Sequence, residues 1–282
     1  MTTRKPWRKV LYEKQCYPDN YTDKKVFLRD LRKNIDFKEV SLTEAVLGAN
    51  LLLQEFCTVV AFVLIYFYMV NKWVVPSKIF QWTSLLTISG FIYYLLFFSA
   101  GIRQKLGHDL RTVLTFIVFG QLFSPVLHTL TDTISTDTIY TTTFFMMLVH
   151  LIFFDYGVSA AIVSNSLSLS AAVFASICLA SRLSSAHEAF ILMTVATETF
   201  VLFPLLRHEI QKPVLVTFSL LSVDAYFLYQ IGGLAITLFV VTVTLVTVIC
   251  PLLFVRYQKY KDNIYGPWDE AVVDDVDSLA FN

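Results

Sequence analysis

The sequence predicts an all-α protein that crosses a membrane several times. Of its 282 residues, 56% are hydrophobic and 15% are aromatic, and the mean hydropathy is +0.61. Soluble domains contain only about 45–50% apolar residues. The apolar residues gather in long blocks, and a helix that spans a bilayer needs about 20 of them in a row. We therefore expect a polytopic integral membrane protein whose helices are these blocks.

A basic head precedes the first apolar block. Residues 1–44 hold 11 Lys and Arg and seven Asp and Glu. This stretch is too polar for a secretory signal peptide, and the block that follows it is too long for a signal core. Between Lys24 and Ile35, apolar residues recur at helical spacing among basic ones. The pattern predicts a short amphipathic helix that either lies on an anionic membrane surface or docks against protein.

Eight apolar blocks follow the head, and each is a candidate membrane helix. They cover residues 45–70, 79–99, 111–130, 139–154, 158–181, 187–206, 214–230 and 232–255. The fourth block is short. The junction between the seventh and eighth blocks is marked only by Gln230, Gly232 and Gly233. These two blocks could therefore form either a tight hairpin or one merged, irregular segment. We expect residues 45–255 to form an eight-helix transmembrane domain and residues 256–282 to form an acidic cytosolic tail.

With eight spans, the Lys and Arg residues are distributed unevenly between the two sides of the membrane. If both termini share a side, that side carries 19 of the 22 Lys and Arg residues, and the other carries only Lys72, Lys78 and Arg182. Cytosolic loops of membrane proteins are enriched in Lys and Arg. The distribution predicts cytosolic termini and supports an even number of spans. The formal net charge is zero, so no overall field favours nucleic acid as a partner.

Motifs for catalysis, nucleotides and metals are missing from the sequence. It contains no glycine-rich dinucleotide motif, P-loop, GxSxG or HExxH. Its four cysteines show no CxxC or other ligand spacing, so we expect neither a disulfide framework nor a zinc site. Asp275 and Asp277 form an Asp-x-Asp triplet, but such a triplet arises easily in an acidic tail. We predict no catalytic residue, metal or cofactor in this chain.

Residues 124–157 form the most polar stretch within the apolar part of the chain, and polar groups at membrane depth are costly and often functional. Pro125 follows Ser124 inside the third block, where a proline either kinks a packed helix or opens a polar cavity. At the start of the fourth block, Thr136 and Asp137 are predicted to cap the helix, because a hydroxyl can accept its free N–H groups and a carboxylate suits its positive end.

His150, Asp155 and Tyr156 lie at the other end of the fourth block, which the predicted topology places in the cytosol. His150 is either a buried, hydrogen-bonded histidine or a functional one, and Asp155 with Tyr156 forms a good turn. Asp137 and His150 are separated by about 20 Å along one helix, at about 1.5 Å per residue. They cannot form a catalytic dyad, so the stretch does not predict a single active site.

Glu55, Glu198 and Asp224 are further acids deep within the apolar blocks. Isolated acids in membrane helices raise the hypothesis of a transporter. They form no paired or repeated pattern, and no inverted repeat with matched Gly or Pro breaks is visible. Packing against neighbouring helices or a partner subunit is the favoured interpretation.

Several stretches of this sequence, in unbroken order, resemble one known family. They are PWRKVLYE at 6–13, PDNY at 18–21, LRKN at 31–34, SPVL at 124–127, HLIFFDYG at 150–157, FASICLASRL at 174–183 and GPWDEA at 266–271. The family is PIG-C, a subunit of the phosphatidylinositol N-acetylglucosaminyltransferase complex. The resemblance covers residues 6 to 271, and its departures cluster in the second, sixth and seventh blocks and in the final tail.

The resemblance implies a subunit of the endoplasmic reticulum membrane that is not itself catalytic. The complex of that family transfers N-acetylglucosamine from UDP-N-acetylglucosamine to phosphatidylinositol on the cytosolic face, the first step of glycosylphosphatidylinositol anchor biosynthesis. Its catalytic subunit is PIG-A, a Rossmann-like glycosyltransferase, which agrees with the missing nucleotide motif here. We expect this chain to scaffold such a catalytic partner and other membrane subunits and to help present the lipid.

The resemblance also directs attention to the residues that would contact the lipid or a partner. We expect these contacts from Trp7, Ser124, Pro125, His150, Asp155, Tyr156 and Trp268. Trp7 and Trp268 would dock the head and the tail onto the catalytic subunit. Glu55, Glu198 and Asp224 lie outside the family's pattern, which weakens any functional role for them.

Two rival hypotheses remain open. The chain could be a membrane transporter or lipid scramblase, for which the intramembrane acids are the motive. Alternatively, it could be an enzyme that acts alone on a lipid through the acids of residues 124–157. Movement of ions or lipids by the purified chain would favour the first rival, and transfer activity without a partner would favour the second.

Overall fold

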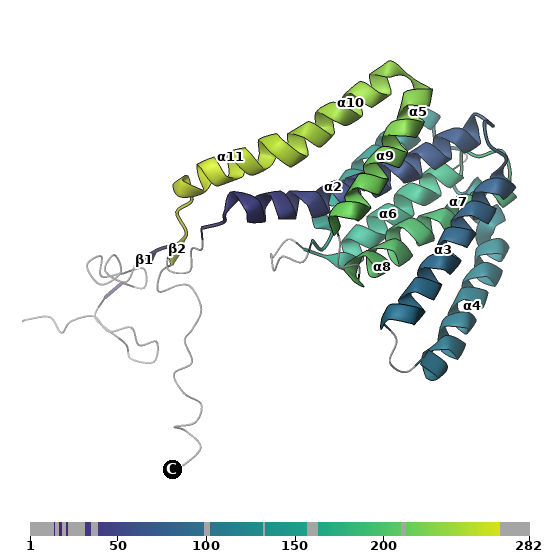
Figure 1. The fold of residues 1–282 in the computed structure, drawn as a ribbon, viewed down its shortest axis with the longest axis horizontal. Coiled ribbons are helices and arrows are strands. Elements are labelled where there is room, and N and C mark those ends of the chain that lie inside the picture. Colours follow the sequence, from purple (N-terminus) through teal and green to yellow (C-terminus); the bar gives the residue numbers. More distant parts are fainter. Residues whose placement is uncertain are drawn as a thin grey trace, which may run out of the picture. The chain divides into compact units, whose positions relative to one another are not determined.

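The computed structural model describes residues 14, 17–18, 21, 32–34, 39–98, 102–131, 133–156, 163–209 and 213–265. The chain divides into two compact units. Unit 1 contains both ends of the chain, residues 1–41 and 253–282, and unit 2 contains residues 42–252. Within the described ranges, the protein is helical apart from one pair of two-residue strands (Figure 1). The predicted all-α class is therefore confirmed.

A helix lies in each of the eight predicted ranges, counted over the described residues. The helical elements are α2 (Leu42–Val70), α3 (Pro76–Phe98), α4 (Ile102–Thr129), α5 (Thr136–Phe153), α6 (Asn165–Ala180), α7 (Ala186–Thr197), the π-helical turn η1 (Glu198–Leu202), α8 (Phe203–Glu209), α9 (Pro213–Ile231), α10 (Gly233–Thr244), the π-helical turn η2 (Leu245–Ile249), α11 (Cys250–Tyr257) and the 3-10 turn η3 (Gln258–Tyr260). The elements α7, η1 and α8 follow one another without a break, as do α10, η2 and α11.

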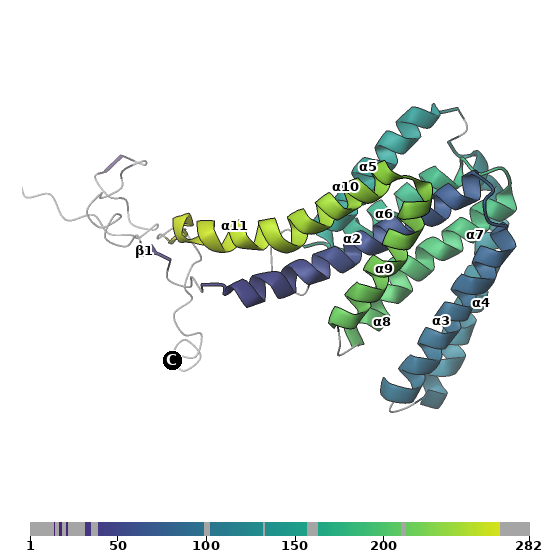
Figure 2. The same ribbon diagram turned by 45° about the horizontal axis from the view of Figure 1, so that its top comes forward.

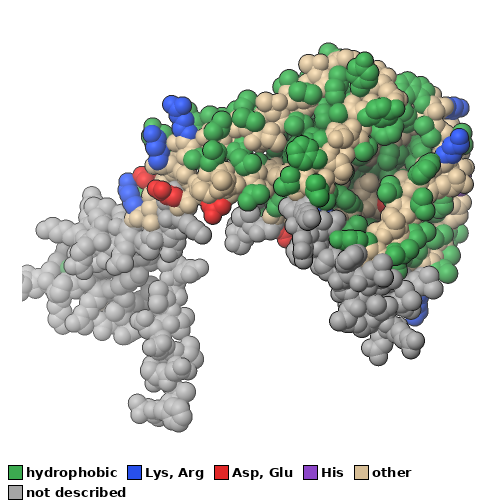
Figure 3. All heavy atoms as spheres, viewed as in Figure 1, with side chains coloured by type: hydrophobic (Ala, Val, Ile, Leu, Met, Phe, Trp, Pro, Cys, Tyr) green, Lys and Arg blue, Asp and Glu red, His purple; other side chains and the backbone are tan. Residues whose placement is uncertain are grey.

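Five of these helical segments are long and apolar enough to cross a membrane, judged over the described residues. They are Leu42–Val70, Arg111–Thr129, Ala186–Arg207, Val214–Ile231 and Gly233–Tyr260. The helix α6 is apolar but shorter. Large hydrophobic side chains are exposed along these helices, and Figure 3 shows them spread over the surface of unit 2. A soluble monomer rarely exposes so much apolar surface, whereas a lipid-facing surface does.

Serine hydroxyls cap three of the helices. The Ser135 side chain accepts the Thr138 N–H at the start of α5, and Ser164 and Ser185 accept N–H groups in the same way at α6 and α7. The cap of α5 is thus Ser135 and not Thr136, because the capping residue keeps an extended backbone while Thr136 is already helical. Asp137 lies in the first turn of α5.

Two boundaries differ from expectation or resolve an alternative. The fifth block predicts a helix from residue 158, whereas α6 begins at Asn165 with Ser164 as its extended N-cap, and residues 157–162 lie outside the described ranges. The helices α9 and α10 are separated by Gly232 alone, whose backbone is extended. The last two blocks therefore form a tight hairpin (Figure 2) and not a merged segment.

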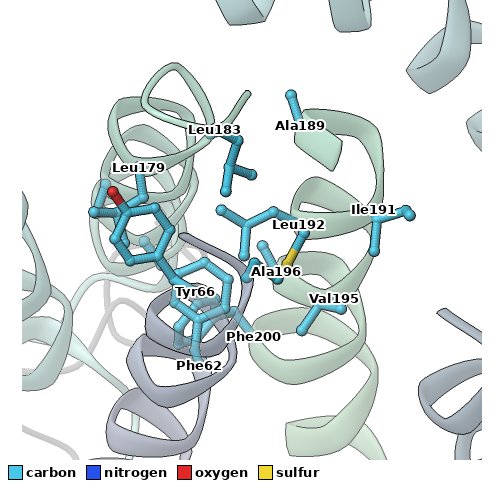
Figure 4. Packing of buried hydrophobic residues seen from close by; sticks show 14 of the residues in the cluster. Phe62, Tyr66, Leu179, Leu183, Ala189, Ile191, Leu192, Val195, Ala196 and Phe200 are labelled. Carbon is cyan, nitrogen blue, oxygen red and sulfur yellow. The ribbon is translucent and has the colours of Figure 1, made fainter. Parts of the chain in front are cut away.

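The main apolar core of unit 2 lies between α2, α6, α7 and η1. Phe62 of α2 meets Phe200 of η1 edge to face with ring centroids 5.1 Å apart, and Leu192 of α7 packs beside them (Figure 4). The facing side of α6 is built from small buried residues, including Ala172 and Ala175. Small residues let membrane helices approach closely without a hydrophobic driving force.

A second, smaller core joins α2 to α9 and α10, and a row of polar side chains runs beside it. Thr217 of α9 accepts a hydrogen bond from Gln54 Nε2 at 2.8 Å and donates to Asn50 Oδ1 at 2.8 Å. Nearer the other end of α2, the Tyr68 hydroxyl donates to Gln230 Oε1 at 3.3 Å. We call this polar contact between the two helices, which also holds the buried Asp224, the α2–α9 seam.

Unit 1 joins the head to the tail. Strand β1 (Arg32–Lys33) pairs antiparallel with β2 (Ile264–Tyr265), and Asn34 N donates to Asn263 O at 2.8 Å. The amphipathic helix predicted over residues 24–35 is therefore wrong at β1, because the backbone groups there bond to the tail and not along a helix. The rest of that range and both docking tryptophans, Trp7 and Trp268, lie outside the described residues.

Side chains reinforce the pairing of head and tail. Lys33 Nζ lies 2.9 Å from Asp262 Oδ2 on the surface. The side-chain amide of Gln258 bonds the backbone of Val40 twice, accepting its N–H at 3.0 Å and donating to its carbonyl at 3.1 Å. Asn34 has a φ of 53°, a left-handed conformation that asparagine tolerates well, and its Oδ1 accepts the Asn263 N–H at 2.8 Å.

Candidate functional site

Four helices of unit 2 enclose a cluster of charged and polar side chains. Glu55 of α2 is fully buried, with Oε1 3.0 Å from His150 Nε2 of α5 and Oε2 2.8 Å from Arg207 Nη1 of α8. The Arg207 contact is an ion pair whose angles are not those of a hydrogen bond. Ser168 of α6 completes the group. We call Glu55, His150, Ser168 and Arg207 the buried ionic cluster.

His150 is held at both ring nitrogens. Its Nδ1 lies 2.8 Å from the Ser168 hydroxyl oxygen and 3.1 Å from the Ser168 carbonyl oxygen, while the same hydroxyl donates to the His150 carbonyl at 3.1 Å. Since Nε2 faces the Glu55 carboxylate, both nitrogens face acceptors. Both ring nitrogens thus have hydrogen-bond partners. The side chain is therefore fixed in orientation by α2 and α6 together.

Aromatic rings surround the cluster. The His150 ring contacts Phe154 and Phe200 edge to face, with centroids 5.6 Å and 5.0 Å away. The Arg207 guanidinium carbon lies 5.3 Å from the centre of the Phe154 ring, a cation–π contact. The charged groups thus lie in an apolar shell, where an ion pair is much stronger than in water and an unpaired charge is much more costly.

The segment that follows His150 closes over this cluster. Phe154 ends α5 with extended backbone, and its N–H bonds the His150 carbonyl at 3.0 Å. The Tyr156 hydroxyl donates to the Leu151 carbonyl at 2.7 Å. Burial raises the pKa of the Tyr156 phenol, and the Glu55 charge raises it further, so this group stays a neutral donor. We call residues 150–156 the corner.

The structure brings some of the predicted contact residues together. His150, Asp155 and Tyr156 all belong to the corner, with His150 fully buried, Tyr156 half-buried and Asp155 exposed. Asp137 begins the same helix at its far end, about 20 Å away at about 1.5 Å per residue. The three corner residues therefore share one end of α5, as the sequence predicted.

Ser124 and Pro125 lie elsewhere. Pro125 sits inside α4, and the buried Ser124 hydroxyl donates to the Ala186 carbonyl at the start of α7. The helical run from Ala186 to Arg207 is roughly 30 Å long at about 1.5 Å per residue. Ser124 consequently attaches α4 to the opposite end of that run, remote from the buried ionic cluster. Nearby, His128 Nε2 lies 2.8 Å from the Leu183 carbonyl oxygen and strengthens the same attachment.

The sequence did not identify Glu55 and Arg207 as functional residues. Each is a lone ionisable residue in or beside an apolar block, and this is the signal that marks them. Their partners are far away in the sequence, so periodicity could not connect them. Asp224 behaves differently, because it is buried next to the Cys57 thiol and forms no ion pair in the described structure.

The cluster links three helices through one carboxylate. One Glu55 oxygen lies next to the His150 imidazole of α5 and the other next to the Arg207 guanidinium of α8. Within the described ranges, no three His, Cys, Asp or Glu side chains are close enough to hold a metal ion. Cys57, Cys178 and Cys250 are free thiols, and Cys16 lies outside those ranges.

Comparison with known proteins connects this chain to named relatives. It is 41% identical over 281 residues to a protein of Rattus norvegicus that is named as a subunit of phosphatidylinositol N-acetylglucosaminyltransferase, covering 96% of this chain and 94% of the relative. It is 40% identical over 278 residues to the Homo sapiens protein of the same name, covering 95% and 93%. The GPI2 subunit of the same transferase from Schizosaccharomyces pombe is 27% identical over 285 residues, covering 95% and 87%.

Solved structures and protein families complete the comparison. No solved structure matches the fold. The sequence matches the GPI2 family, described as phosphatidylinositol N-acetylglucosaminyltransferase, over residues 7–269. That range includes all four residues of the buried ionic cluster and the whole corner. The chain belongs to the GPI2 family of phosphatidylinositol N-acetylglucosaminyltransferase proteins, the PIG-C group that its sequence resembles.

Proposed function

We propose that this chain is a membrane subunit of a complex that transfers N-acetylglucosamine from UDP-N-acetylglucosamine to phosphatidylinositol, the first step of glycosylphosphatidylinositol anchor biosynthesis. The observation that carries the proposal is the match along 95–96% of the chain to relatives named as subunits of that transferase. The subunit acts in the endoplasmic reticulum membrane as a non-catalytic scaffold, and a PIG-A-like glycosyltransferase subunit performs the transfer.

The corner is the part of this subunit that helps to present the lipid. Asp155 offers an exposed carboxylate, and carboxylates accept hydrogen bonds from hydroxyls such as those of an inositol ring. Tyr156 places a neutral phenol beside it. Both stand on a base that is fixed by the buried ionic cluster, and a rigid base favours binding because less conformational entropy is lost.

The membrane topology that accompanies this function has eight spans and cytosolic termini. The 23 residues of α3 and the 18 residues of α5 are about 35 Å and 27 Å long, enough for a hydrocarbon core of about 30 Å with some local adjustment. The hydrogen bonds between head and tail support termini on one side of the membrane and hence an even number of spans. The Lys and Arg distribution supports the cytosol as that side.

Substitutions at the corner test the lipid-presenting role. We expect Asp155→Ala in the assembled complex to raise the KM for phosphatidylinositol and to leave the KM for UDP-N-acetylglucosamine unchanged, because the lipid and the nucleotide sugar bind different subunits. Asp137→Ala, at the opposite end of α5, is the matched control. Unchanged kinetics in Asp155→Ala and in Tyr156→Phe would refute lipid presentation and leave the scaffold role standing.

Co-purification tests the scaffold role. Solubilised in mild detergent, the tagged chain should bring down a glycosyltransferase with a soluble nucleotide-binding domain, and mass spectrometry would identify it. The purified chain alone should neither transfer N-acetylglucosamine nor move ions or lipids across liposomes. Either activity in the isolated chain would contradict the proposal and support one of the rival functions.

A further inference from the structure

We infer that Glu55 is a positioning residue for the lipid-presenting corner. Its two carboxylate oxygens hold His150 at the end of α5 and Arg207 in α8, at 3.0 Å and 2.8 Å. Glu55 is the group that joins these two side chains, and it lies in a third helix. The inference rests on the proposed function, since it explains how the presenting corner is held in place.

Arg207 also contacts the corner directly. Its guanidinium stacks on Phe154, which ends α5 one residue before Asp155. The Arg207 side chain is 9% exposed, and the Glu55 side chain is fully buried. Movement of Arg207 would therefore release Phe154, and Phe154 is covalently adjacent to the exposed carboxylate that the lipid would meet. Glu55 acts on the corner through Arg207 and His150 and does not touch the lipid.

The π-helical turn η1 contributes to this geometry. It lies directly before α8 and ends at Leu202, five residues before Arg207. A π-turn adds one residue to a helix, and each residue rotates an α-helix by about 100°. Without the extra residue, α8 would be rotated by about 100° relative to α7, and Arg207 would face away from Glu55. The turn η1 thus places the Arg207 guanidinium next to the Glu55 carboxylate. Such π-turns occur frequently at functional sites.

Single substitutions that remove one charge of this cluster cannot separate positioning from folding. Removing one member of a buried ion pair leaves the other charge uncompensated, which is strongly destabilising. The informative variant is the double substitution Glu55→Gln with Arg207→Met. It removes both charges at nearly constant volume, and the glutamine carbonyl can still accept the His150 Nε2 hydrogen bond. The Asp224→Asn variant is the matched control, because Asp224 is equally buried but forms no ion pair in the described structure.

The experiment measures steady-state kinetics of the complete complex with varied phosphatidylinositol in mixed micelles. The double variant should assemble with its partners, show a KM for phosphatidylinositol raised about tenfold, and keep the KM for UDP-N-acetylglucosamine of the parent complex. Adding Asp155→Ala to the double variant should produce little further increase, because both changes disable the same corner. The control should match the parent complex in every constant.

Three outcomes would overturn the inference. One is a double variant that assembles normally and keeps the KM for phosphatidylinositol within about twofold of the parent. Another is an equal change in both KM values, which a merely structural role would cause. The third applies if the double variant fails to assemble, in which case Glu55→Asp is measured instead, because it keeps the charge but shortens the side chain by one methylene. A selective increase of the KM for phosphatidylinositol in Glu55→Asp supports the inference, and unchanged kinetics in this variant refute it.

The experiment also separates this inference from the function on which it rests. A KM increase in Asp155→Ala without one in the double variant means that the corner presents the lipid but that Glu55 does not position it. If neither variant changes the KM for phosphatidylinositol, the lipid-presenting role itself fails.

Discussion

Glu55 and Asp224 are two buried acids of the same membrane domain with opposite surroundings. Glu55 of α2 contacts the His150 imidazole of α5 with one oxygen and the Arg207 guanidinium of α8 with the other. Asp224 faces α2 from α9, where its neighbour is the Cys57 thiol, and it forms no ion pair in the described structure. The first acid is bound into the main body of unit 2. The second lies in the smaller α2–α9 seam.

The difference teaches how an ionisable group can be tolerated at membrane depth. A carboxylate loses its hydration when it is buried, and close cations with additional hydrogen bonds can compensate for that loss. Such compensation makes each partner indispensable to the other. A carboxyl group that forms no ion pair leaves no charge uncompensated when it is replaced, so a neutral group of similar shape lowers the cost of burial and breaks no ion pair. Substitutions should therefore have unequal effects in the two regions.

The largest effect is expected from Arg207→Met. It leaves the buried Glu55 carboxylate without its closest cation, and loss of one partner of a buried pair typically costs about 3–5 kcal/mol. The purified complex should show a large fall in the apparent Tm of this chain, followed by fluorescence-detected size-exclusion after heating. The double substitution with Glu55→Gln should recover most of the loss. If Arg207→Met left the Tm unchanged, the pair would not be a stabilising contact.

A smaller effect is expected from Ser168→Ala. The substitution removes the hydroxyl that lies 2.8 Å from His150 Nδ1 and donates to the His150 carbonyl, but the Ser168 backbone carbonyl remains within 3.1 Å of Nδ1. The expected loss is about 2 kcal/mol, at about 1 kcal/mol for each of the two hydrogen bonds. The same heating assay measures it, with Ser176→Ala in the same helix as control, because the Ser176 hydroxyl bonds only within α6. Equal losses in both variants would mean that the His150 contact adds nothing.

A still smaller effect is expected in the other region from Thr217→Val. This hydroxyl links α9 to Gln54 and Asn50 of α2, at 2.8 Å in each case. Hydrogen bonds between membrane helices contribute on average about 0.6 kcal/mol. A slight fall in Tm should result, with Thr237→Val as the comparison, since that hydroxyl bonds inside α10. A loss as large as that of Arg207→Met would show that the seam is as important as the buried ionic cluster.

The smallest effect is expected from Asp224→Asn. No ion pair is broken, and the neutral amide is easier to bury than a carboxylate, so the stability should stay within about 0.5 kcal/mol or rise slightly. The measurement is the apparent Tm beside the parent protein. A large loss would reveal a partner of Asp224 in the assembled complex, and the contrast with Glu55 would then disappear.

The positions of the helices could be predicted well from the sequence. A run of about 20 apolar residues is a strong local signal, and each predicted block contains a helix within the described ranges. The errors concern short polar features. The fifth block predicts a helix from residue 158, whereas α6 begins at Asn165, and the cap predicted at Thr136 is provided by Ser135. A change in one or two hydrogen bonds decides such boundaries, and apolar content does not report on it.

The candidate site could be predicted only in part. The corner residues His150, Asp155 and Tyr156 can be identified from the sequence because they share one end of a helix, which is a local property. Glu55 and Arg207 cannot, because their contact depends on how three helices pack. The strand at Arg32–Lys33 escapes prediction for the same reason, since its partner lies more than 200 residues further along the chain. The docking roles of Trp7 and Trp268 remain predictions.

The pairing of β1 with β2 has a consequence for the biosynthesis of the protein. The ribosome releases the head before α2 is made, whereas Ile264 emerges only after the last described helix. Unit 1 therefore cannot close until every intervening helix has been inserted. In the proposed topology, a chain that inserted one helix too few or too many would leave its two ends on opposite sides of the membrane, where β1 and β2 could not pair.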